Sequence, residues 1–323
     1  MISVRKISMV SLVVFCLPLS GLCGNNPFTV LPWNGYKAAY SLTFDDGDPC
    51  HLDVAIPEMT KRHLRGTFNL ISSRIPRLEE WKKVPALGQE IGNHTYSHVH
   101  PVTFTHEEEM KQVLTAQKDL EKIFGFPILT FTYPFTEITP SYEKCAQTYH
   151  FISRGGWGPT YFLKPDMDID WGNIPSESTA TKTDPKLYRE WIDRTLAEGC
   201  WFLIRIHGIE GTITGYQPIK KKEFTDLLDY LVSKRDNLWI APFGEIGGYW
   251  RAQRIVEKAV SNTIGAKTRW SWERPAVFPD GVVLKMKIDG KVNVTQNGKS
   301  VIPVNGLYSI SFDAKELTIE TKP

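Results

Sequence analysis

Two carboxylates stand side by side at the end of an apolar run. Asp45 and Asp46 follow the strand-like residues 37–44 and precede Gly47. Adjacent side chains point to opposite sides of a strand, but a turn at Gly47 would let both carboxylates face one site. The same residue types also make ordinary turns. Taken alone, the pair therefore predicts either a loop or a catalytic site.

Two histidines four residues apart supply the groups that an aspartate pair lacks for metal binding. His94 and His98 could share one face of a helical turn and bind one metal ion. With one aspartate they would form a three-ligand set with open positions, which suits a catalytic metal. The other aspartate would be free to act as a base on water. His207 ends the apolar run 201–206, and we expect it to complete an acid–base pair with Asp45.

Strand-like and helix-like segments alternate from about residue 37 to 245. We expect strands at 37–44, 66–71, 89–92, 128–133, 151–153, 200–206 and 238–241, and helices at 53–63, 106–123, 140–148, 184–198, 222–234 and 245–260. This alternation predicts an α/β fold, a parallel sheet covered by helices. The number of units favours an irregular (β/α) barrel, in which catalytic groups lie at the carboxyl ends of the strands.

The motifs resemble those of the polysaccharide deacetylases, the NodB-homology family of carbohydrate esterases, over roughly residues 37–245. Residues 43–47 (TFDDG) resemble the family's first motif, and 94–98 (HTYSH) its His-Ser/Thr-x-x-His motif. The resemblance implies that Asp45 is the catalytic base. It also implies that the metal ligands are Asp46, His94 and His98.

Three further segments extend the resemblance. Residues 132–135 stand where the family has Arg-x-Pro-Tyr/Phe, which implies that the Phe135 N–H stabilises an oxyanion. Asp170 and Trp171 resemble the fourth motif, which lines the substrate groove and tunes the catalytic histidine. Residues 203–207 resemble the Leu-x-x-x-His element, which implies that His207 is the general acid.

The third motif departs from the family pattern. Thr132 occupies the position of the arginine that orients the base aspartate, and Thr136 that of a glycine. Arg205 is one candidate substitute, because on a strand it would face the same way as His207. Arg154 is the other candidate, and both could equally be ordinary surface or ion-pairing arginines.

The resemblance implies a metal-dependent hydrolase that removes acetyl groups from a carbohydrate. The expected metal is a single divalent ion, zinc before cobalt, nickel or iron. N-deacetylation of an amino-sugar polysaccharide or oligosaccharide is the first expectation. An O-acetyl esterase acting on xylan-like glycans, and a non-catalytic carbohydrate-binding relic of the fold, are the alternatives. A non-haem iron oxygenase would also use two histidines and a carboxylate, but the βα alternation argues against its double-sheet fold.

The last part of the chain has a different pattern. Period-2 runs are separated by the pairs Asp289-Gly290, Asn297-Gly298 and Asn305-Gly306. Such pairs between alternating runs are typical of β-hairpins. We therefore expect a deacetylase-type domain at 27–264 and a small antiparallel β-module at 265–323, with linker-like residues at 265–279.

The N-terminus has the pattern of a signal peptide. Arg5 and Lys6 precede an apolar run at 9–19, and small residues follow at 21–24. We expect residues 1–23 to be removed and the protein to be secreted, periplasmic or held at the cell surface. The run is too short for a stable membrane span, although an uncleaved anchor, or a lipid on Cys23, is an alternative.

Charge and cysteine content narrow the partners. Beyond residue 23 the chain has 36 basic and 36 acidic residues, so nothing indicates a nucleic-acid partner. The expected partner is the acetylated glycan. Cys50, Cys145 and Cys200 allow at most one disulfide and match no zinc ribbon.

Overall fold

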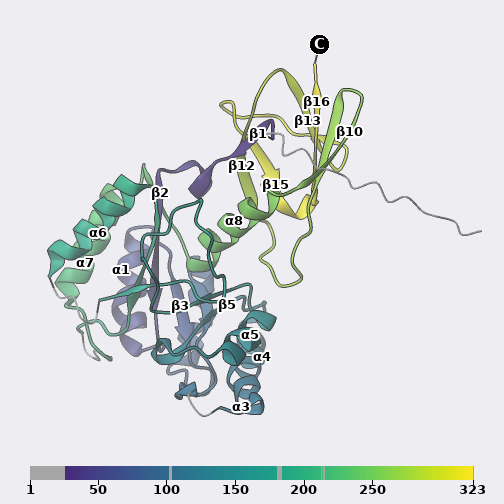
Figure 1. Cartoon of the computed structure of the whole chain (residues 1–323). Coiled ribbons are helices and arrows are strands. Elements are labelled where there is room, and N and C mark those ends of the chain that lie inside the picture. The colour runs from purple at the N-terminus through teal and green to yellow at the C-terminus, as the bar shows by residue number, and fades with distance from the viewer. Residues whose placement is uncertain (1–25, 102–103, 180–183, 212, 214, 323) are drawn as a thin grey trace, which may run out of the picture.

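A curled sheet of parallel strands forms the centre of the molecule (Figure 1). The computed structural model describes residues 26–101, 104–179, 184–211, 213 and 215–322, so the predicted signal peptide lies outside the described residues. In spatial order, the strands are β6 (Ile152–Arg154), β5 (Thr130–Thr132), β4 (Glu90–Asn93), β3 (Thr67–Leu70), β2 (Ala38–Phe44), β8 (Trp201–Ile206) and β7 (Glu177–Ser178), and β9 (Leu238–Ile240) also pairs with β2.

Strand β2 is the hub of this sheet, and all seven of its residues are buried. One edge pairs with β8 along its length, while the other pairs with β9 at its start and with β3 at its end. A strand buried on both faces is expected to be a continuous run of apolar and small residues, as β2 is. Residues 174–178 link the two sides of the sheet, because Ile174 bridges to Arg154 and Glu177 pairs with Ile204. The predicted irregular (β/α) barrel is confirmed.

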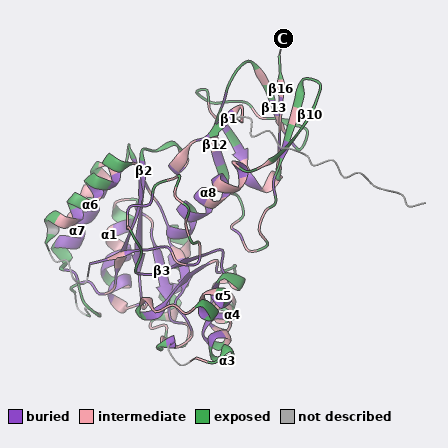
Figure 2. Ribbon diagram, in the orientation of Figure 1, coloured by how far each residue is buried: buried purple, intermediate pink, exposed green. Residues whose placement is uncertain are grey.

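Helices cover the outside of this sheet and bury their apolar sides against it (Figure 2). They are α1 (Ile56–Lys61), α2 (Leu78–Trp81), α3 (His106–Met110), α4 (Ala116–Phe124), α5 (Pro140–Tyr149), α6 (Pro185–Glu198), α7 (Lys221–Ser233) and α8 (Phe243–Val256). Local signals set several of their ends. Thr105 forms a capping box with Glu108 before α3, and Asp184 caps α6. No helix among the described residues is both long and apolar enough to cross a membrane.

Two antiparallel sheets form a separate region at the carboxyl end. One has the order β1 (Phe28–Val30), β12 (Val283–Ile288), β15 (Tyr308–Ser311). The other has the order β10 (Val260–Ile264), β11 (Lys267–Ser271), β16 (Glu316–Thr321), β13 (Val292–Gln296), β14 (Lys299–Ser300). The expected boundary at 264/265 therefore falls inside the β10–β11 hairpin, and residues expected to be a linker form β11. Gly265, which the sequence pattern places at the start of a linker, is instead a positive-φ residue in the turn between β10 and β11.

Only part of the predicted hairpin pattern is present. Asn297 and Gly298 both have positive φ and connect the paired strands β13 and β14, as a two-residue hairpin turn requires. The hairpin expected at Asp289-Gly290 is wrong, because β12 and β13 lie in different sheets. At that pair only Gly290 has positive φ, and the Asp289 N–H bonds to the Pro27 carbonyl beside β1.

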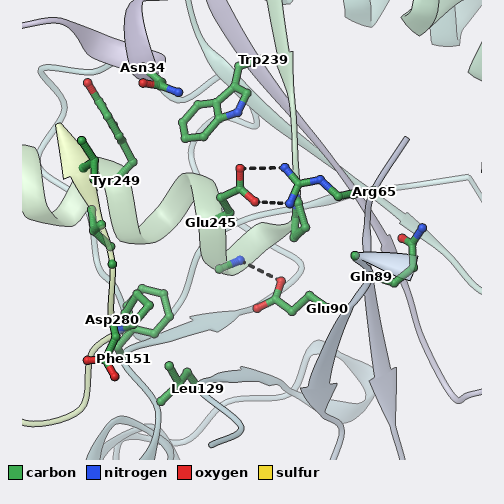
Figure 3. A pocket seen from close by; sticks show the side chains of 17 residues that line it. Asn34, Arg65, Gln89, Glu90, Leu129, Phe151, Trp239, Glu245, Tyr249 and Asp280 are labelled. Atoms are coloured by element: carbon green, nitrogen blue, oxygen red, sulfur yellow. Dashed lines mark hydrogen bonds and ion pairs between the residues drawn. The ribbon is translucent and has the colours of Figure 1, made fainter. Parts of the chain in front are cut away.

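A cavity of about 510 Å³ lies where the amino ends of the parallel strands meet this β region (Figure 3). Its charged side chains pair with protein partners. Arg65 binds Glu245 through two hydrogen bonds of 2.5 and 2.9 Å. The Glu90 carboxylate accepts hydrogen bonds from the Thr67 hydroxyl at 2.5 Å and the Gly244 N–H at 2.9 Å. Glu90 thereby satisfies a free N–H at the start of α8 and ties that helix to the sheet.

Candidate metal centre and active site

The aspartate pair sits on a sharp turn at the carboxyl end of β2. Asp46 and Gly47 both have positive φ, at 75° and 68°. A side chain at Gly47 would place its Cβ 2.8 Å from Leu70, so this position needs glycine for space as well as for conformation. The turn lets Asp45 point into the barrel, where it is 2% exposed, and brings Asp46 to the adjoining cavity.

Asp46, His94 and His98 lie together, with their ligand atoms all within 4.8 Å of one another. The Asp46 Oδ1 atom is 3.5 Å from His94 Nε2 and 3.4 Å from His98 Nε2. The expectation that the two histidines share a helical turn is wrong. They flank a loop in which Thr95 and His98 have positive φ, and the Thr95 hydroxyl accepts a hydrogen bond from the His98 N–H.

This cluster fits a divalent metal by its chemistry. Asp46 Oδ1 is buried and has no hydrogen-bond partner among the described residues, although both imidazoles face it. His94 Nδ1 is 2.9 Å from the Thr132 carbonyl oxygen, to which its N–H would donate, leaving the Nε2 lone pair free for a metal. Burial lowers the pKa of His98 to about 4, and nearby His94 lowers it too, so this ligand is neutral at physiological pH.

Asp45 is held by three hydrogen bonds from two side chains of other elements. Arg154 Nη2, on β6, donates to both carboxylate oxygens at 2.6 and 2.5 Å, and Asn69 Nδ2, on β3, donates to Oδ1 at 2.8 Å. Arg154 is 1% exposed and is fixed in turn by the Ser176 hydroxyl at 2.9 Å. Burial opposes ionisation of Asp45, but Arg154, His94 and His207 outweigh it and hold the pKa of Asp45 well below its usual range.

His207 lies on the other side of Asp45. Its Nε2 atom is 3.8 Å from Asp45 Oδ2, and its Nδ1 atom is buried without a partner among the described residues. Burial lowers the pKa of His207, while Asp45 and Asp46 raise it. The buried ring of His51 helps to fix the backbone of His207, because His51 Nε2 lies 2.6 Å from the His207 carbonyl oxygen. The His207 side chain therefore lies close enough to Asp45 for both to contact the same bound group.

The loop after β5 borders the same cavity. Phe135 and Thr136 both have positive φ, at 55° and 61°. The Phe135 N–H has no acceptor among the described backbone groups, so it is available as a donor to a ligand. Thr136 stands where the resemblance leads one to expect glycine, and its side chain lies against Gly156 on the neighbouring loop. Gly156 has no Cβ, so the space that Thr136 needs is free.

The cavity at the candidate metal centre has a volume of about 560 Å³ and opens at the carboxyl ends of the strands. It brings together the predicted residues Asp45, Asp46, His94, His98, Phe135, Arg205 and His207. Exposed Trp157 and Tyr216 also line it. Of the two arginines considered as substitutes in the third motif, Arg154 binds Asp45, whereas Arg205 forms no ion pair with a described residue.

Asp170 and Trp171 do not lie at this cavity. Trp171 packs edge-on against Trp250 at 5.2 Å between ring centroids, and Asp170 lies on the surface near Glu143 and Gln147. Asn69, Ser176 and His51 are supporting residues that sequence reasoning did not find. They are ordinary polar residues in or beside predicted elements, and only the sheet order and register bring them to Asp45 and His207.

Comparison with known proteins agrees with this geometry. Residues 34–151 match the family model for polysaccharide deacetylase. A peptidoglycan-N-acetylglucosamine deacetylase of Bacillus cereus is 29% identical over 150 residues, covering 46% of this chain and 50% of that protein. A second one from the same species is 32% identical over 140 residues, covering 43% of this chain and 62% of that protein. The chain thus spans about half to three fifths of the length of these relatives.

One solved structure supports the fold alone. The crystal structure of a candidate polysaccharide deacetylase from Mycobacterium smegmatis aligns with a TM-score of 0.51 at 18% identity, covering 71% of this chain and 96% of that one. Together with the match to the family model, this confirms the resemblance found in the motifs. Over residues 34–151 the chain is thus similar to the polysaccharide deacetylase family, with the NodB-homology type of domain.

Proposed function

We propose that the protein is a metal-dependent hydrolase that removes acetyl groups from N-acetylated amino sugars of a polysaccharide or oligosaccharide, with zinc as the metal. The observation that carries the proposal is the pairing of two sets of groups in one cavity. Three metal-ligand atoms lie within 4.8 Å of one another, and a buried carboxylate held by Arg154 adjoins them. The peptidoglycan deacetylases among the relatives support an amino-sugar substrate.

The residues divide the reaction among themselves. Asp46, His94 and His98 would hold the metal, which when bound polarises the acetyl carbonyl and makes water more acidic. Asp45 takes a proton from the water that attacks the carbonyl carbon. Arg154 and Asn69 keep the Asp45 carboxylate ionised and oriented for that transfer.

The remaining groups act on the two ends of the breaking bond. The free Phe135 N–H can donate to the oxygen that becomes negative as water adds. His207 delivers a proton to the amine nitrogen as the carbon–nitrogen bond breaks, which releases acetate and a free amino sugar. Trp157, 74% exposed at the cavity rim, offers an aromatic face on which a sugar ring can stack.

The same groups could cleave an acetyl ester, so the choice of bond needs a direct test. Acetate release would be measured from chitooligosaccharides, peptidoglycan glycan strands and acetylated xylan, with chelator and with added zinc. We expect zinc-dependent release from the amino-sugar substrates and its loss in Asp45→Asn. Release from xylan alone would favour the esterase. Absence of release from every glycan, with zinc bound, would favour a non-catalytic binding protein.

Location and domain roles are part of the proposal. We infer that the N-terminal segment directs the protein out of the cytoplasm. Its glycan substrates would lie outside the cytoplasm as well. The carboxyl-terminal β region packs beside α8 and provides one wall of the cavity at the amino ends of the strands. Its position away from the metal centre suits a supporting role. Mass spectrometry of the N-terminus of the exported protein would test the predicted cleavage after residue 23.

A further inference from the structure

The cavity at the metal centre contains positive charge that the protein does not neutralise. Asp45 and Asp46 are the carboxylates that line it, and the metal site and Arg154 account for both. Arg74 and Arg205 also line it. Among the described residues, neither arginine forms an ion pair or a side-chain hydrogen bond. Two guanidinium groups therefore face a cavity where a substrate would have to bind.

Arg205 is the more unusual of the two, because it is half-buried as well as unpaired. Its Nε atom is buried and has no hydrogen-bond partner among the described residues. Burial lowers the pKa of Arg205 to about 10, and the neighbouring charge of Arg154 lowers it too, while Asp45 and Glu177 raise it. Leaving a partly desolvated guanidinium unpaired costs free energy, so its retention here needs an explanation other than stability.

The backbone around Arg205 leaves it accessible from the cavity. A side chain at Gly156 would place its Cβ 2.9 Å from Arg205 Nη1, so glycine keeps the guanidinium clear on that side. The next residue, Trp157, is 74% exposed and lines the same cavity. A sugar ring stacked on Trp157 would thus lie near the Arg205 guanidinium and the metal centre.

We propose that the substrate is an acidic acetylated glycan, and that Arg205 binds a carboxylate carried by a sugar at or next to the reacting acetyl group. This inference rests on the proposed deacetylase function and adds the substrate class. A guanidinium presents a planar fork of N–H donors that matches a carboxylate, which explains an arginine at this position. Arg74, exposed at the same rim, adds to the attraction for an anion.

A matched pair of glycans tests the carboxylate directly. Peptidoglycan glycan strands, freed of peptide, carry a lactyl carboxylate on alternate N-acetylated sugars. The same strands with these groups blocked as methylamides keep their acetyl groups but lose the charge. For the wild-type protein with zinc we expect kcat/KM for acetate release to be roughly 10- to 100-fold higher on the charged strands, the ratio that one charge-assisted hydrogen bond supports.

Variants assign the preference to Arg205. Arg205→Met should remove most of this ratio, mainly through KM, and Arg205→Lys should retain part of it. Arg189→Met is the matched control, because Arg189 is exposed on α6 against Tyr230, away from the cavity. If wild-type protein treats both strands equally, the proposal is wrong. It is also wrong if Arg205→Met lowers kcat equally on both, since Arg205 would then act on Asp45 alone.

Binding separates this inference from the proposed function. Deacetylated strands, charged or methylamide-blocked, cannot be turned over, and calorimetry with the wild-type protein compares their affinities. Tighter binding of the charged strands, lost in Arg205→Met, supports the carboxylate site even if no glycan releases acetate. Equal affinities overturn it even if deacetylation is observed.

Discussion

The two ends of the parallel strands differ in how their polar groups are partnered. At the amino ends, Arg65 pairs with Glu245 (Figure 3), and the Glu90 carboxylate accepts hydrogen bonds from Thr67 and Gly244. At the carboxyl ends, buried atoms of Asp46, Arg205 and His207 have no partner among the described residues. The cavities are similar in volume, about 510 and 560 Å³. Cavity volume therefore does not distinguish the candidate active site from the cavity at the amino ends.

Positive φ values are more frequent at the carboxyl ends, although Asn34 beside the other cavity also has one. Asp46, Thr95, His98, Phe135 and Thr136 all have positive φ and all lie in the loops at the carboxyl ends. Such conformations cost free energy in residues other than glycine and are found where function requires them. At the carboxyl-end cavity, unpaired buried atoms thus accompany several positive-φ residues, whereas the charged groups at the amino-end cavity are paired. Substitutions at the two ends should then separate activity from stability.

The largest expected effect on activity is at the candidate metal centre. His98→Ala removes one ligand, and we expect kcat/KM to fall by at least roughly 100-fold, because the metal's stabilisation of developing charge amounts to several kcal/mol. His98 makes no hydrogen bond through its ring, so the unfolding free energy of the metal-free protein should change little. Acetate release, zinc content and denaturant unfolding in chelator would be measured together. A large loss of stability without loss of zinc would contradict the comparison.

Arg154→Met should be the one change at the carboxyl ends that affects both properties. It leaves the Asp45 carboxylate buried without its cation, which typically costs about 3–5 kcal/mol. Activity should fall as well, since Asp45 loses the group that keeps it ionised. Denaturant unfolding and kcat measured on the folded fraction would check this. Arg205→Met is the control, and a similar stability loss there would show that Arg205, too, is a structural cation.

Much of the site could be predicted because its residues lie in short motifs. Asp45, Asp46, His94, His98 and His207 were all found from strand ends and spacing, and the structure gathers them in one cavity. The choice between Arg154 and Arg205 could not be made from sequence. Both lie on strands and point inward, and only the three-dimensional arrangement of β6, β2 and β8 shows which one reaches Asp45.

Prediction failed where pairing is not local. The alternation of strands and helices at 37–245 indicated the barrel correctly, because each βα unit is set by neighbouring residues. In the carboxyl-terminal region, β12 pairs with β1 from the other end of the chain and with β15, instead of with β13. The alternating pattern indicates strands but says nothing about which partner each one takes.

Glu90→Ala should lower stability without lowering activity. It leaves the Gly244 N–H and the Thr67 hydroxyl without their acceptor, at a cost of about 1–3 kcal/mol. Arg65→Met is the control at the same cavity, and its half-exposed ion pair should contribute only about 0–1 kcal/mol. Unfolding free energies and kcat/KM of both variants would be compared. A fall in kcat/KM for Glu90→Ala would show that the two ends are coupled.

The smallest expected effect concerns the carboxylate pair that Asp170 forms with Glu143, away from both cavities. Burial and the nearby Asp170 raise the pKa of Glu143 to about 7 from its ordinary 4.5. Glu143 is therefore harder to ionise in the folded than in the unfolded state. As the pH rises from the unfolded pKa of Glu143 to its folded pKa, the free energy of unfolding falls. Glu143→Gln should increase the unfolding free energy by roughly 0.5–1 kcal/mol at about pH 8 and leave it unchanged at about pH 4.

Denaturant unfolding of Glu143→Gln at the two pH values would measure this difference. Glu107→Gln is the matched control, because Glu107 is exposed and has no ion pair with a described residue. An increase at both pH values would mean that the amide gains a hydrogen bond, and no increase at either would mean that solvent screens the two carboxylates. If kcat/KM on the glycan changed as well, Asp170 would act on the active site after all, as its motif first suggested, and the separation of this pair from the catalytic end would be wrong.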